Sequence, residues 1–132
     1  MNFVSIRVIT DDVKRLVQFY EQVTGLSAKW STEDFAELIS PVGILAIAST
    51  RTIQLFGANA ARPADNHSVI IEFRVNDVDK AYEKLKSVIS EVVKEPTTMP
   101  WGNRSLLFRD PDGNLINFFT PMSADAIQKY ER

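Results

Sequence analysis

Two stretches of the chain repeat the same helical pattern of apolar residues, 65 positions apart. In each stretch the apolar residues recur at i, i+3, i+4 and i+7, the spacing of one face of an amphipathic helix. An aspartate stands just before each stripe, where it suits the positive end of a helix, and Gly25 is a natural stop for the first helix. We therefore predict two helices, one with the stripe Val13, Leu16, Val17, Tyr20 and Val23, the other with Val78, Ala81, Tyr82, Leu85 and Val88.

Alternating apolar and polar residues precede each predicted helix, which predicts a strand in both places. The first strand has Val4, Ile6 and Val8 on one side, and the second has Ile71 and Phe73 on the corresponding side. Each helix is followed by short apolar runs, and a turn rich in proline and glycine interrupts each set. These turns lie at 40–43 and 110–113, and the further strands are predicted at 36–39, 44–48 and 52–56, and at 92–94, 105–109 and 115–119.

The two halves therefore predict two βαβββ modules joined by a segment without apolar periodicity. Neither module is large enough to bury its sheet alone, so we predict that they pair into one α+β domain with a cup-shaped mixed sheet. A short helix is also expected near the C-terminus, with Ser123 as its cap and with Ile127 and Tyr130 on one face. The expected single domain covers 1–132, with module one at about 1–56, the linker at 57–66, module two at 67–121 and the tail at 122–132.

Composition narrows the classes of protein. The chain has 132 residues, no cysteine, one histidine and a formal net charge of −2. These counts exclude a disulfide scaffold, a thiolate metal site and a multi-histidine cage within one chain. Basic and acidic residues are balanced in both halves, so we expect no nucleic-acid partner. The longest apolar run, 42–48, is too short to cross a bilayer, and the N-terminus lacks a signal-peptide pattern, so we expect a cytoplasmic protein with no membrane partner.

Several short motifs accompany the repeat. In the first half they are 5–8 (Ser-Ile-Arg-Val), which leads to Asp12-Val13, followed by Phe19-Tyr20 and Gly25-Leu26. In the second half they are 73–79, 100–104 (Pro-Trp-Gly-Asn-Arg) and 110–114 (Asp-Pro-Asp-Gly-Asn). With the repeat, they make the chain resemble the vicinal oxygen chelate superfamily, also called the glyoxalase, bleomycin-resistance and dioxygenase fold. The resemblance implies paired half-open cups around a cavity, a small-molecule ligand and a homodimer.

The metal enzymes of that superfamily place one ligand on the first strand and one on the last strand of each module, usually His, Gln or Glu. Carried over by counting from the helix-start aspartates and the turn glycines, the four positions are Ser5, Ile47, Ile70 and Asn117, with Ala46 as the alternative to Ile47. Isoleucine has no lone pair, and serine and asparagine are weak neutral ligands for a hard cation. We therefore predict that the chain binds no metal at these positions and uses no cofactor.

Three charged residues share the strand side opposite the expected helix-packing residues: Arg7, Glu72 and Arg74. Charged groups on a concave face need a partner or water. One hypothesis makes them a structural ion pair across the two first strands, or simply solvent-exposed. The other makes them the anchor of a polar or anionic ligand, because arginine offers two parallel donors. We include them with the four strand positions as candidate ligand-binding residues.

Trp101 and Arg104 lie on an expected loop and complete the candidate ligand-binding residues. They could form a stacking surface for a flat ligand, and the alternatives are a wall packed against the core or a subunit contact. We expect His67 to be a partly exposed residue at a strand end rather than a catalytic or metal-binding residue. Most of the other aromatic residues are expected in the core, namely Trp30, Phe35, Phe56, Phe108 and Phe119.

The sequence favours a metal-free protein that sequesters a planar or antibiotic-like small molecule over an enzyme. Binding would depend on desolvation and stacking in a preformed cavity, with Arg7, Glu72, Arg74 or Asn117 setting the orientation of the ligand. Two other functions stay open. One is a divalent-metal-dependent lyase or dioxygenase of the same superfamily, and the other is a metal-free enzyme with Glu72 as a base. Apart from Glu72 in the second of these, no catalytic residue is assigned.

Overall fold

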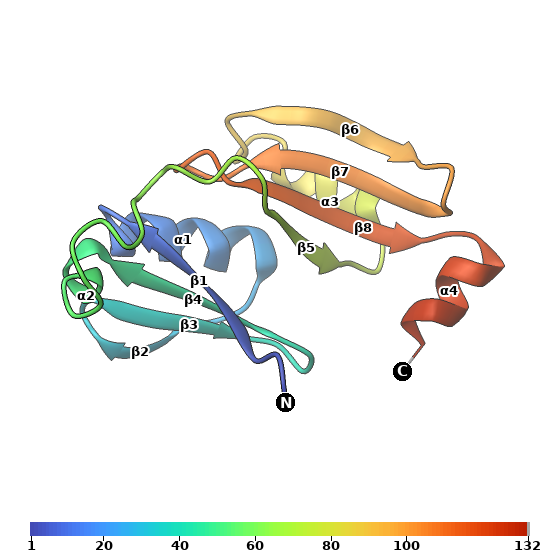
Figure 1. Cartoon of the computed structure of the whole chain (residues 1–132). Coiled ribbons are helices and arrows are strands. Elements are labelled where there is room, and N and C mark those ends of the chain that lie inside the picture. The colour runs from blue at the N-terminus through green and yellow to red at the C-terminus, as the bar shows by residue number, and fades with distance from the viewer. Residues whose placement is uncertain (132) are drawn as a thin grey trace. The chain divides into compact units, whose positions relative to one another are not determined.

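The structure, a computed structural model, describes residues 1–131 and falls into two compact units, each with its own sheet (Figure 1). The first unit contains residues 1–66 and the turn 111–113, and the second contains residues 67–110 and the described residues from 114 onward. Both units have the order β-α-β-β-β followed by a short helix, so the predicted α+β fold with a duplicated βαβββ module is confirmed. None of the helices in residues 1–131 has the length and apolar character needed to span a membrane.

The first unit is built on a four-stranded sheet with the strand order β1-β4-β3-β2. Strand β1 runs parallel to β4, whereas β3 is antiparallel to both of its neighbours. Helix α1 connects β1 to β2 and packs against β3 and β4 (Figure 1). The elements are β1 Ser5–Thr10, α1 Val13–Thr24, β2 Lys29–Thr32, β3 Phe35–Ile39, β4 Ile44–Ser49 and α2 Thr50–Ile53.

The second unit repeats this arrangement with the strand order β5-β8-β7-β6. Here β5 is parallel to β8, and β7 is antiparallel to β6 and β8. Helix α3 packs on this sheet, and α4 follows the end of β8 (Figure 1). The elements are β5 Ile70–Arg74, α3 Val78–Leu85, β6 Val92–Thr98, β7 Asn103–Arg109, β8 Leu115–Pro121 and α4 Ala124–Tyr130.

Helix α1 has the limits and the buried stripe that its sequence predicts. All five stripe residues are at most 7% exposed. At its start, the Asp12 carboxylate accepts a hydrogen bond from the backbone N–H of Arg15 at 3.1 Å, which satisfies one of the free donors of the first turn. At its end, Gly25 has a φ of 74°, a left-handed conformation that costs glycine nothing sterically. Local sequence therefore sets both ends of the helix.

Helix α3 begins as predicted but ends earlier. The Asp77 carboxylate caps it by accepting a hydrogen bond from the backbone N–H of Lys80 at 3.1 Å. The helix stops at Leu85, whose carbonyl accepts hydrogen bonds from the N–H groups of Val88 and Ile89 at 2.8 and 2.9 Å. Val88 is thus half-buried beyond the helix, and Ile89, at 6% exposed, is the residue that enters the core.

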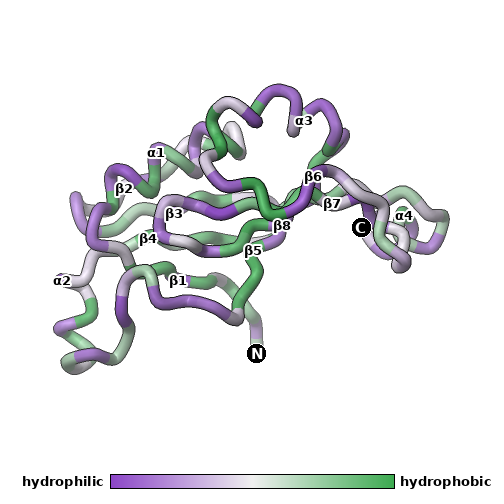
Figure 2. Tube along the Cα trace, turned by 90° about the horizontal axis from the view of Figure 1, so that it is seen from above, coloured by the Kyte–Doolittle hydropathy of each residue, from purple (hydrophilic) through white to green (hydrophobic). Residues whose placement is uncertain are grey.

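Strand register divides each sheet into two faces, because directly paired residues point to the same side. In the first sheet Leu38 pairs with Leu45 and Ala36 pairs with Ile47, and all four residues are at most 6% exposed. We call the side covered by the helix the helix face and the other side the open face. In the tube of Figure 2, hydrophobic colour runs along β4, whereas the tube of α1 alternates between hydrophobic and hydrophilic.

The helix face of the second sheet is built around phenylalanine rings. The ring of Phe118 meets the rings of Phe73 and Phe108 edge to face, with centroid distances of 5.6 and 5.0 Å. The residues that alternate with them belong to the open face and include Glu72 and Asn117, which pair with each other across β5 and β8. Each unit therefore has an apolar side under its helix and a side that carries polar groups.

The strand predicted at 52–56 is wrong, because β4 runs directly into the helical turn α2. The Ser49 hydroxyl accepts a hydrogen bond from the backbone N–H of Arg51 at 3.2 Å, and the Thr52 hydroxyl donates to the Ser49 carbonyl at 2.7 Å. Such side-chain bonds to the backbone compete with strand pairing and favour a turn. The turn then completes a small apolar cluster on the open face of the first sheet, formed by Ile9, Ala48 and Ile53 with Phe35 packed against it.

Strand β2 is an edge strand that the sequence pattern does not reveal. All four of its residues are exposed, so no buried side imposes an apolar alternation. The strand is held by the pairing of Lys29 with Glu37 and of Trp30 with Ala36, and a bulge precedes Thr32. Trp30 is 42% exposed there, so its expected place in the core is wrong.

The predicted C-terminal helix is confirmed as α4. The Ser123 hydroxyl accepts a hydrogen bond from the backbone N–H of Ala126 at 3.1 Å. The Tyr130 ring lies 5.0 Å from the ring of Phe119, between centroids. At the start of the helix, the backbone N–H of Ser123 donates to the carbonyl of Gly102 at 3.1 Å. These contacts hold α4 against β8 and against the turn between β6 and β7.

Candidate functional site

Arg7 stands on the open face of the first sheet beside two aromatic rings. Its Cζ lies 5.0 Å from the centroid of the Phe35 ring and 5.6 Å from that of the Phe56 ring. Phe35 belongs to β3, whereas Phe56 follows α2 and is 67% exposed. Rings over a guanidinium attract it through cation–π interaction and leave the N–H groups at its edge for other partners. Within residues 1–131, Arg7 has no hydrogen bond or ion pair, so these donors are available to a ligand.

The strands next to β1 continue the row on which Arg7 lies. Arg7 pairs with Ala46 of β4, Ala46 pairs with Glu37 of β3, and Glu37 pairs with Lys29 of β2. The side chain between Arg7 and Glu37 is therefore a single methyl group. This row gives the first unit a strip of open face on which a cationic and an anionic group flank a small apolar floor.

In the second unit, Asn117 holds Glu72 across the open face. The Asn117 Nδ2 donates to Glu72 Oε2 at 2.8 Å. Asn117 is only 9% exposed, and its Oδ1 accepts no hydrogen bond from the residues that the structure describes. A buried acceptor left without a donor typically costs about 1–3 kcal/mol. The pair therefore presents an acceptor that a ligand or a water molecule would satisfy.

Arg74 shares the open face with Glu72 but points to the C-terminal helix. Its Nη1 donates to the backbone carbonyl of Tyr130 at 2.5 Å. No ion pair joins Arg74 to Glu72 within residues 1–131. Arg74 is thus a neighbour of α4 rather than a member of the pair formed by Glu72 and Asn117.

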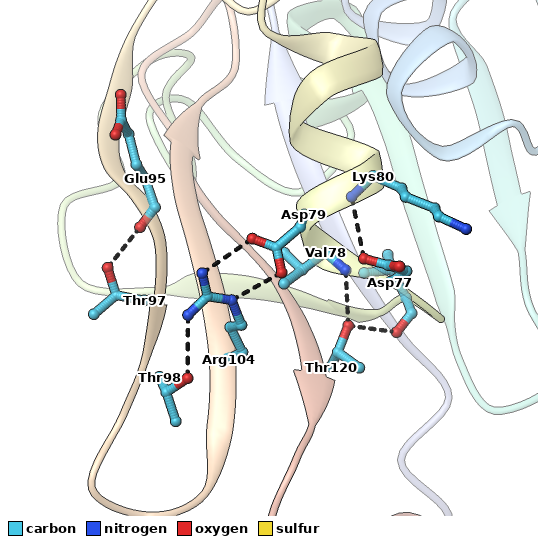
Figure 3. Close-up of polar contacts among 10 residues, drawn as sticks. Asp77, Val78, Asp79, Lys80, Glu95, Thr97, Thr98, Arg104 and Thr120 are labelled. Carbon is cyan, nitrogen blue, oxygen red and sulfur yellow. Dashed lines mark hydrogen bonds and ion pairs between the residues drawn. The ribbon is translucent and has the colours of Figure 1, made fainter.

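The structure does not place Arg104 with the other predicted site residues. Arg104 is two residues before the buried Leu106 on β7 and so shares its side of the sheet, the helix face. Its Nε and Nη2 donate to the Asp79 carboxylate at 2.9 and 3.0 Å, and its Nη1 donates to the Thr98 hydroxyl at 3.2 Å (Figure 3). This pairing lowers the pKa of Asp79 and raises that of Arg104. Arg104 therefore joins β7 to the first turn of α3.

The strand positions carried over from metal enzymes are divided between the two faces. Ile47 is 1% exposed and pairs with Val8, so it lies on the helix face, opposite to Ser5. Ala46, one residue earlier, lies on the open face of the sheet with Ser5. In the second unit Ile70 is 47% exposed and lies on the open face with Asn117.

Trp101 occupies the turn between β6 and β7 and is 69% exposed. A wall packed against the core does not describe such a side chain, so ligand stacking and a subunit contact stay as predictions. Among the other aromatic residues, Phe108 and Phe119 are buried as expected, whereas Phe56 is exposed beside Arg7. His67 is exposed in the bend before β5, close to the strand end at which it was expected.

Comparison with known proteins identifies the family. The glyoxalase/bleomycin resistance protein/dioxygenase superfamily matches residues 2–118. The chain belongs to this superfamily. A protein of Bacillus subtilis (strain 168), the uncharacterized protein YraH, is 28% identical over 131 residues, which cover 90% of this chain and 98% of that protein.

Solved structures of the superfamily have the same fold. A glyoxalase/bleomycin resistance protein/dioxygenase from Nocardioides superposes with a TM-score of 0.74 at 24% identity, covering 94% of this chain and 85% of its own. A glyoxalase/bleomycin resistance protein/dioxygenase family enzyme from Burkholderia phytofirmans PsJN superposes with a TM-score of 0.81 at 16% identity. The superposition covers 92% of this chain and 100% of that chain. These likenesses support the fold, whereas the ligand has to be argued from the side chains of this chain.

The side chains of this chain do not fit the divalent metal that enzymes of the superfamily hold. On the open faces, the ligand positions are Ser5 and Ala46 in the first unit and Ile70 and Asn117 in the second. A hydroxyl and an amide are neutral donors, and they compensate poorly for the desolvation of a divalent cation. Among the described residues, no group of three or more His, Asp or Glu side chains is arranged to hold a metal ion.

Two residues of the candidate site, Phe56 and Glu37, are not predicted from the sequence. The sequence pattern predicts a strand that ends at Phe56. Ser49 and Thr52 favour a helical turn just before it, and this is the signal that could have shown that the strand is absent. Glu37 shares the row of Arg7 only because of the register of β3 and β4. That register is set by the turn in which the Ser40 N–H donates to the Gly43 carbonyl at 3.0 Å.

Proposed function

We propose that this chain is a metal-independent small-molecule-binding protein and that the open face of each unit is a ligand-binding surface. The observation that carries the proposal is Arg7, a guanidinium beside two phenyl rings and without a polar partner in residues 1–131. A guanidinium binds a carboxylate or phosphate through two parallel hydrogen bonds, and the rings supply apolar surface for a flat group. The ligand class that fits is therefore a planar molecule with an anionic group.

The open face of the second unit, taken by itself, carries groups of the opposite kind. Glu72 and Asn117 offer acceptor oxygens, one of them buried and unsatisfied, to N–H or O–H groups of a ligand. Ser5 in the first unit, and Ile70 and Trp101 in the second, would be less specific contacts of their own units, since a binding site needs few polar groups among apolar ones. Sequestration of the ligand by a homodimer, the assembly that the superfamily resemblance implies, belongs to the same proposal, as does the cytoplasmic location expected from the sequence.

Thermal denaturation of the chelator-treated full chain tests the proposal. The probes are 2-naphthoate, its neutral analogue 2-naphthamide, bleomycin, and the ions Mn²⁺, Ni²⁺ and Zn²⁺. A ligand that binds the native state raises the melting temperature with concentration, and we expect 2-naphthoate to do so more strongly than 2-naphthamide. If the metal ions raise it strongly and the organic probes do not, the chain is better explained as a metal-dependent lyase or dioxygenase, and the proposal fails.

Variants of Arg7 test the residue that carries the argument. Arg7→Lys keeps the charge but loses the planar fork, and Arg7→Met loses both, so we expect each to weaken the binding of 2-naphthoate, by about tenfold or more for methionine. The control is Arg15→Met, which removes an exposed arginine from α1. Equal binding of 2-naphthoate by the Arg7 and Arg15 variants would contradict the assigned role of Arg7.

A further inference from the structure

The second unit contains a pocket of about 270 Å³ under its C-terminal helix. The end of β5 and the loop after it form one wall, the end of β8 forms a second, and α4 with the residue after it forms a third. None of Glu72, Asn117 and Ile70 lines this pocket, so it is separate from the open-face pair of the same unit. The side chains that define it are Arg74, Val75, Asn76, Pro121, Ile127 and Glu131.

The pocket is lined by one positively charged residue, Arg74, and one negatively charged residue, Glu131. Each of them makes a hydrogen bond that involves the backbone of α4 or of the residue after it. Arg74 donates through Nη1 to the carbonyl of Tyr130 at 2.5 Å, and its Nε and Nη2 have no partner within residues 1–131. The backbone N–H of Glu131 donates to the carbonyls of Ile127 and Gln128 at 3.1 and 3.3 Å, which positions that residue at the end of α4. No ion pair joins Arg74 to Glu131 among the described residues. Both charges therefore line the pocket unneutralised by each other.

The remaining walls are mostly apolar. Val75, Pro121 and Ile127 line the pocket, and Ile127 is 42% exposed. Thr120 also lines it, but its hydroxyl is already used, because it donates to the Val75 carbonyl at 2.9 Å and accepts from the Val78 N–H at 3.0 Å. The Asn76 side chain has no hydrogen bond within residues 1–131 and adds one neutral polar group. A ligand here meets two charges, one amide and an aliphatic surface.

We propose that this pocket binds a small zwitterion, with an aliphatic α-amino acid as the ligand class. The carboxylate would accept hydrogen bonds from Nε and Nη2 of Arg74, the ammonium group would pair with Glu131, and the side chain would pack on Ile127 and Pro121. A simple anion would meet the carboxylate of Glu131, and a simple cation would meet the guanidinium of Arg74. The volume lies just below the range of about 300–1,000 Å³ that is typical of pockets for drug-sized ligands, which suits a molecule as small as an amino acid.

Binding in this pocket would also stabilise the C-terminal helix. Ile127 and Glu131 belong to or directly follow α4, so a ligand that contacts them and Arg74 bridges the helix to the sheet. The bond from Arg74 to Tyr130 holds the guanidinium before the ligand arrives, which lowers the entropic cost of binding. The proposal does not depend on the ligand of the open faces.

Methyl and side-chain N–H NMR signals of the full chain test the proposal. The probe is L-leucine, and the matched probes are 4-methylpentanoate, which lacks the ammonium group, and 3-methylbutylamine, which lacks the carboxylate. We expect L-leucine to shift the Ile127 methyl and Arg74 Nε–H signals saturably and each analogue to bind about tenfold more weakly or worse, because each loses one charge-assisted pair. No saturable shift with millimolar L-leucine, or equal binding of 4-methylpentanoate, would overturn the zwitterion assignment.

Variants separate the two charges from the fold of the helix. Arg74→Gln removes the carboxylate partner but also the bond to Tyr130, whereas Glu131→Gln removes the ammonium partner and leaves that bond in place. We expect both to weaken L-leucine binding about tenfold, and Glu131→Gln to leave the Tyr130 signals unchanged. Lys129→Gln, which changes a charge of α4 outside the pocket lining, is the control. Binding by Glu131→Gln as tight as by the control would refute the proposal.

Discussion

Arg104 and Asp79 form a bidentate pair that joins strand β7 to the first turn of helix α3, with bonds of 2.9 and 3.0 Å (Figure 3). The same turn is held from β8 as well, because the backbone N–H of Val78 donates to the Thr120 hydroxyl at 3.0 Å. Two strands thus satisfy groups at the start of one helix. The Arg104 end of the motif 100–104, which helps to identify the superfamily, therefore supports the position of a helix rather than a ligand.

The pair makes acid stability depend on Asp79. Hydrogen bonding to Arg104 lowers the pKa of Asp79 below its ordinary value of 3.8, so the folded protein binds this proton more weakly than the unfolded chain does. The stabilisation is fully present above the unfolded pKa and is lost as the pH falls through the folded pKa. In urea unfolding, we expect wild type to be more stable than Asp79→Asn at neutral pH and this difference to shrink as the pH falls below about 4.

A double-mutant cycle isolates this effect from other carboxylates. In the Arg104→Gln background, the change Asp79→Asn should leave no difference that depends on pH, because the partner that shifts the pKa is gone. A difference between wild type and Asp79→Asn that stays constant through the acid range would show that the pair does not set the pKa.

Gly102 lies too close to α4 to accept a side chain. A Cβ at this position would lie 2.0 Å from Ser123 Oγ and 2.8 Å from Ser123 Cβ, and the φ of Gly102 is 98°. We expect Gly102→Ala to lower the free energy of unfolding by about 1–3 kcal/mol in urea titration and to move α4, because the start of the helix must shift. The change should be visible in the Tyr130 NMR signals.

Gly113 provides the matched control for that substitution. It also has a positive φ, of 84°, but a Cβ there would meet no atom within 4 Å. Gly113→Ala should therefore cost only the backbone strain, about 1–2 kcal/mol, and leave the Tyr130 signals in place. If the two alanine variants displaced α4 equally, contact with Ser123 would not be the cause.

The face assigned to Ile47 predicts a large effect on stability and none on ligand binding. Ile47 is 1% exposed on the helix face, so Ile47→Ala should cost about 2–5 kcal/mol through the cavity it leaves. Ile44 lies on the same strand but on the open face, where it is half-buried. The change Ile44→Ala should therefore lower the free energy of unfolding clearly less than Ile47→Ala does. Urea unfolding measures both, and equal losses would mean that the register of β4 is assigned wrongly.

Structural features that are set by residues close together in the chain, such as helix limits, could be predicted from the sequence. The limits of α1 follow from Asp12, Gly25 and the stripe between them, and α4 follows from Ser123 and a short amphipathic pattern. The duplication is also visible, because the same cap and the same stripe recur at a constant offset. In each case the interaction that stabilises the element spans only a few positions of the chain.

Structural features that depend on strand register, or on contacts between residues far apart in the chain, could not be predicted from the sequence. Ile47 was assigned to the cavity by counting from a glycine, and a shift of one residue in a strand moves a side chain to the other face. Arg104 has its partner Asp79 on a different element, 25 residues away, and no periodicity in either segment indicates this. The ring of Phe56 reaches Arg7 only because α2 replaces the expected strand.

Asn117 offers a test of whether the open face of the second unit is kept for binding. Its Oδ1 is buried without a donor from the described residues, whereas its partner Glu72 is exposed and can be solvated. Asn117→Leu, similar in size, should therefore leave the free energy of unfolding unchanged or raise it, by up to about 1–3 kcal/mol. Urea unfolding of the variant and of wild type measures this difference. A loss of stability comparable to that of Ile47→Ala would instead make Asn117 a structural residue, and the unsatisfied oxygen would then carry no argument for binding.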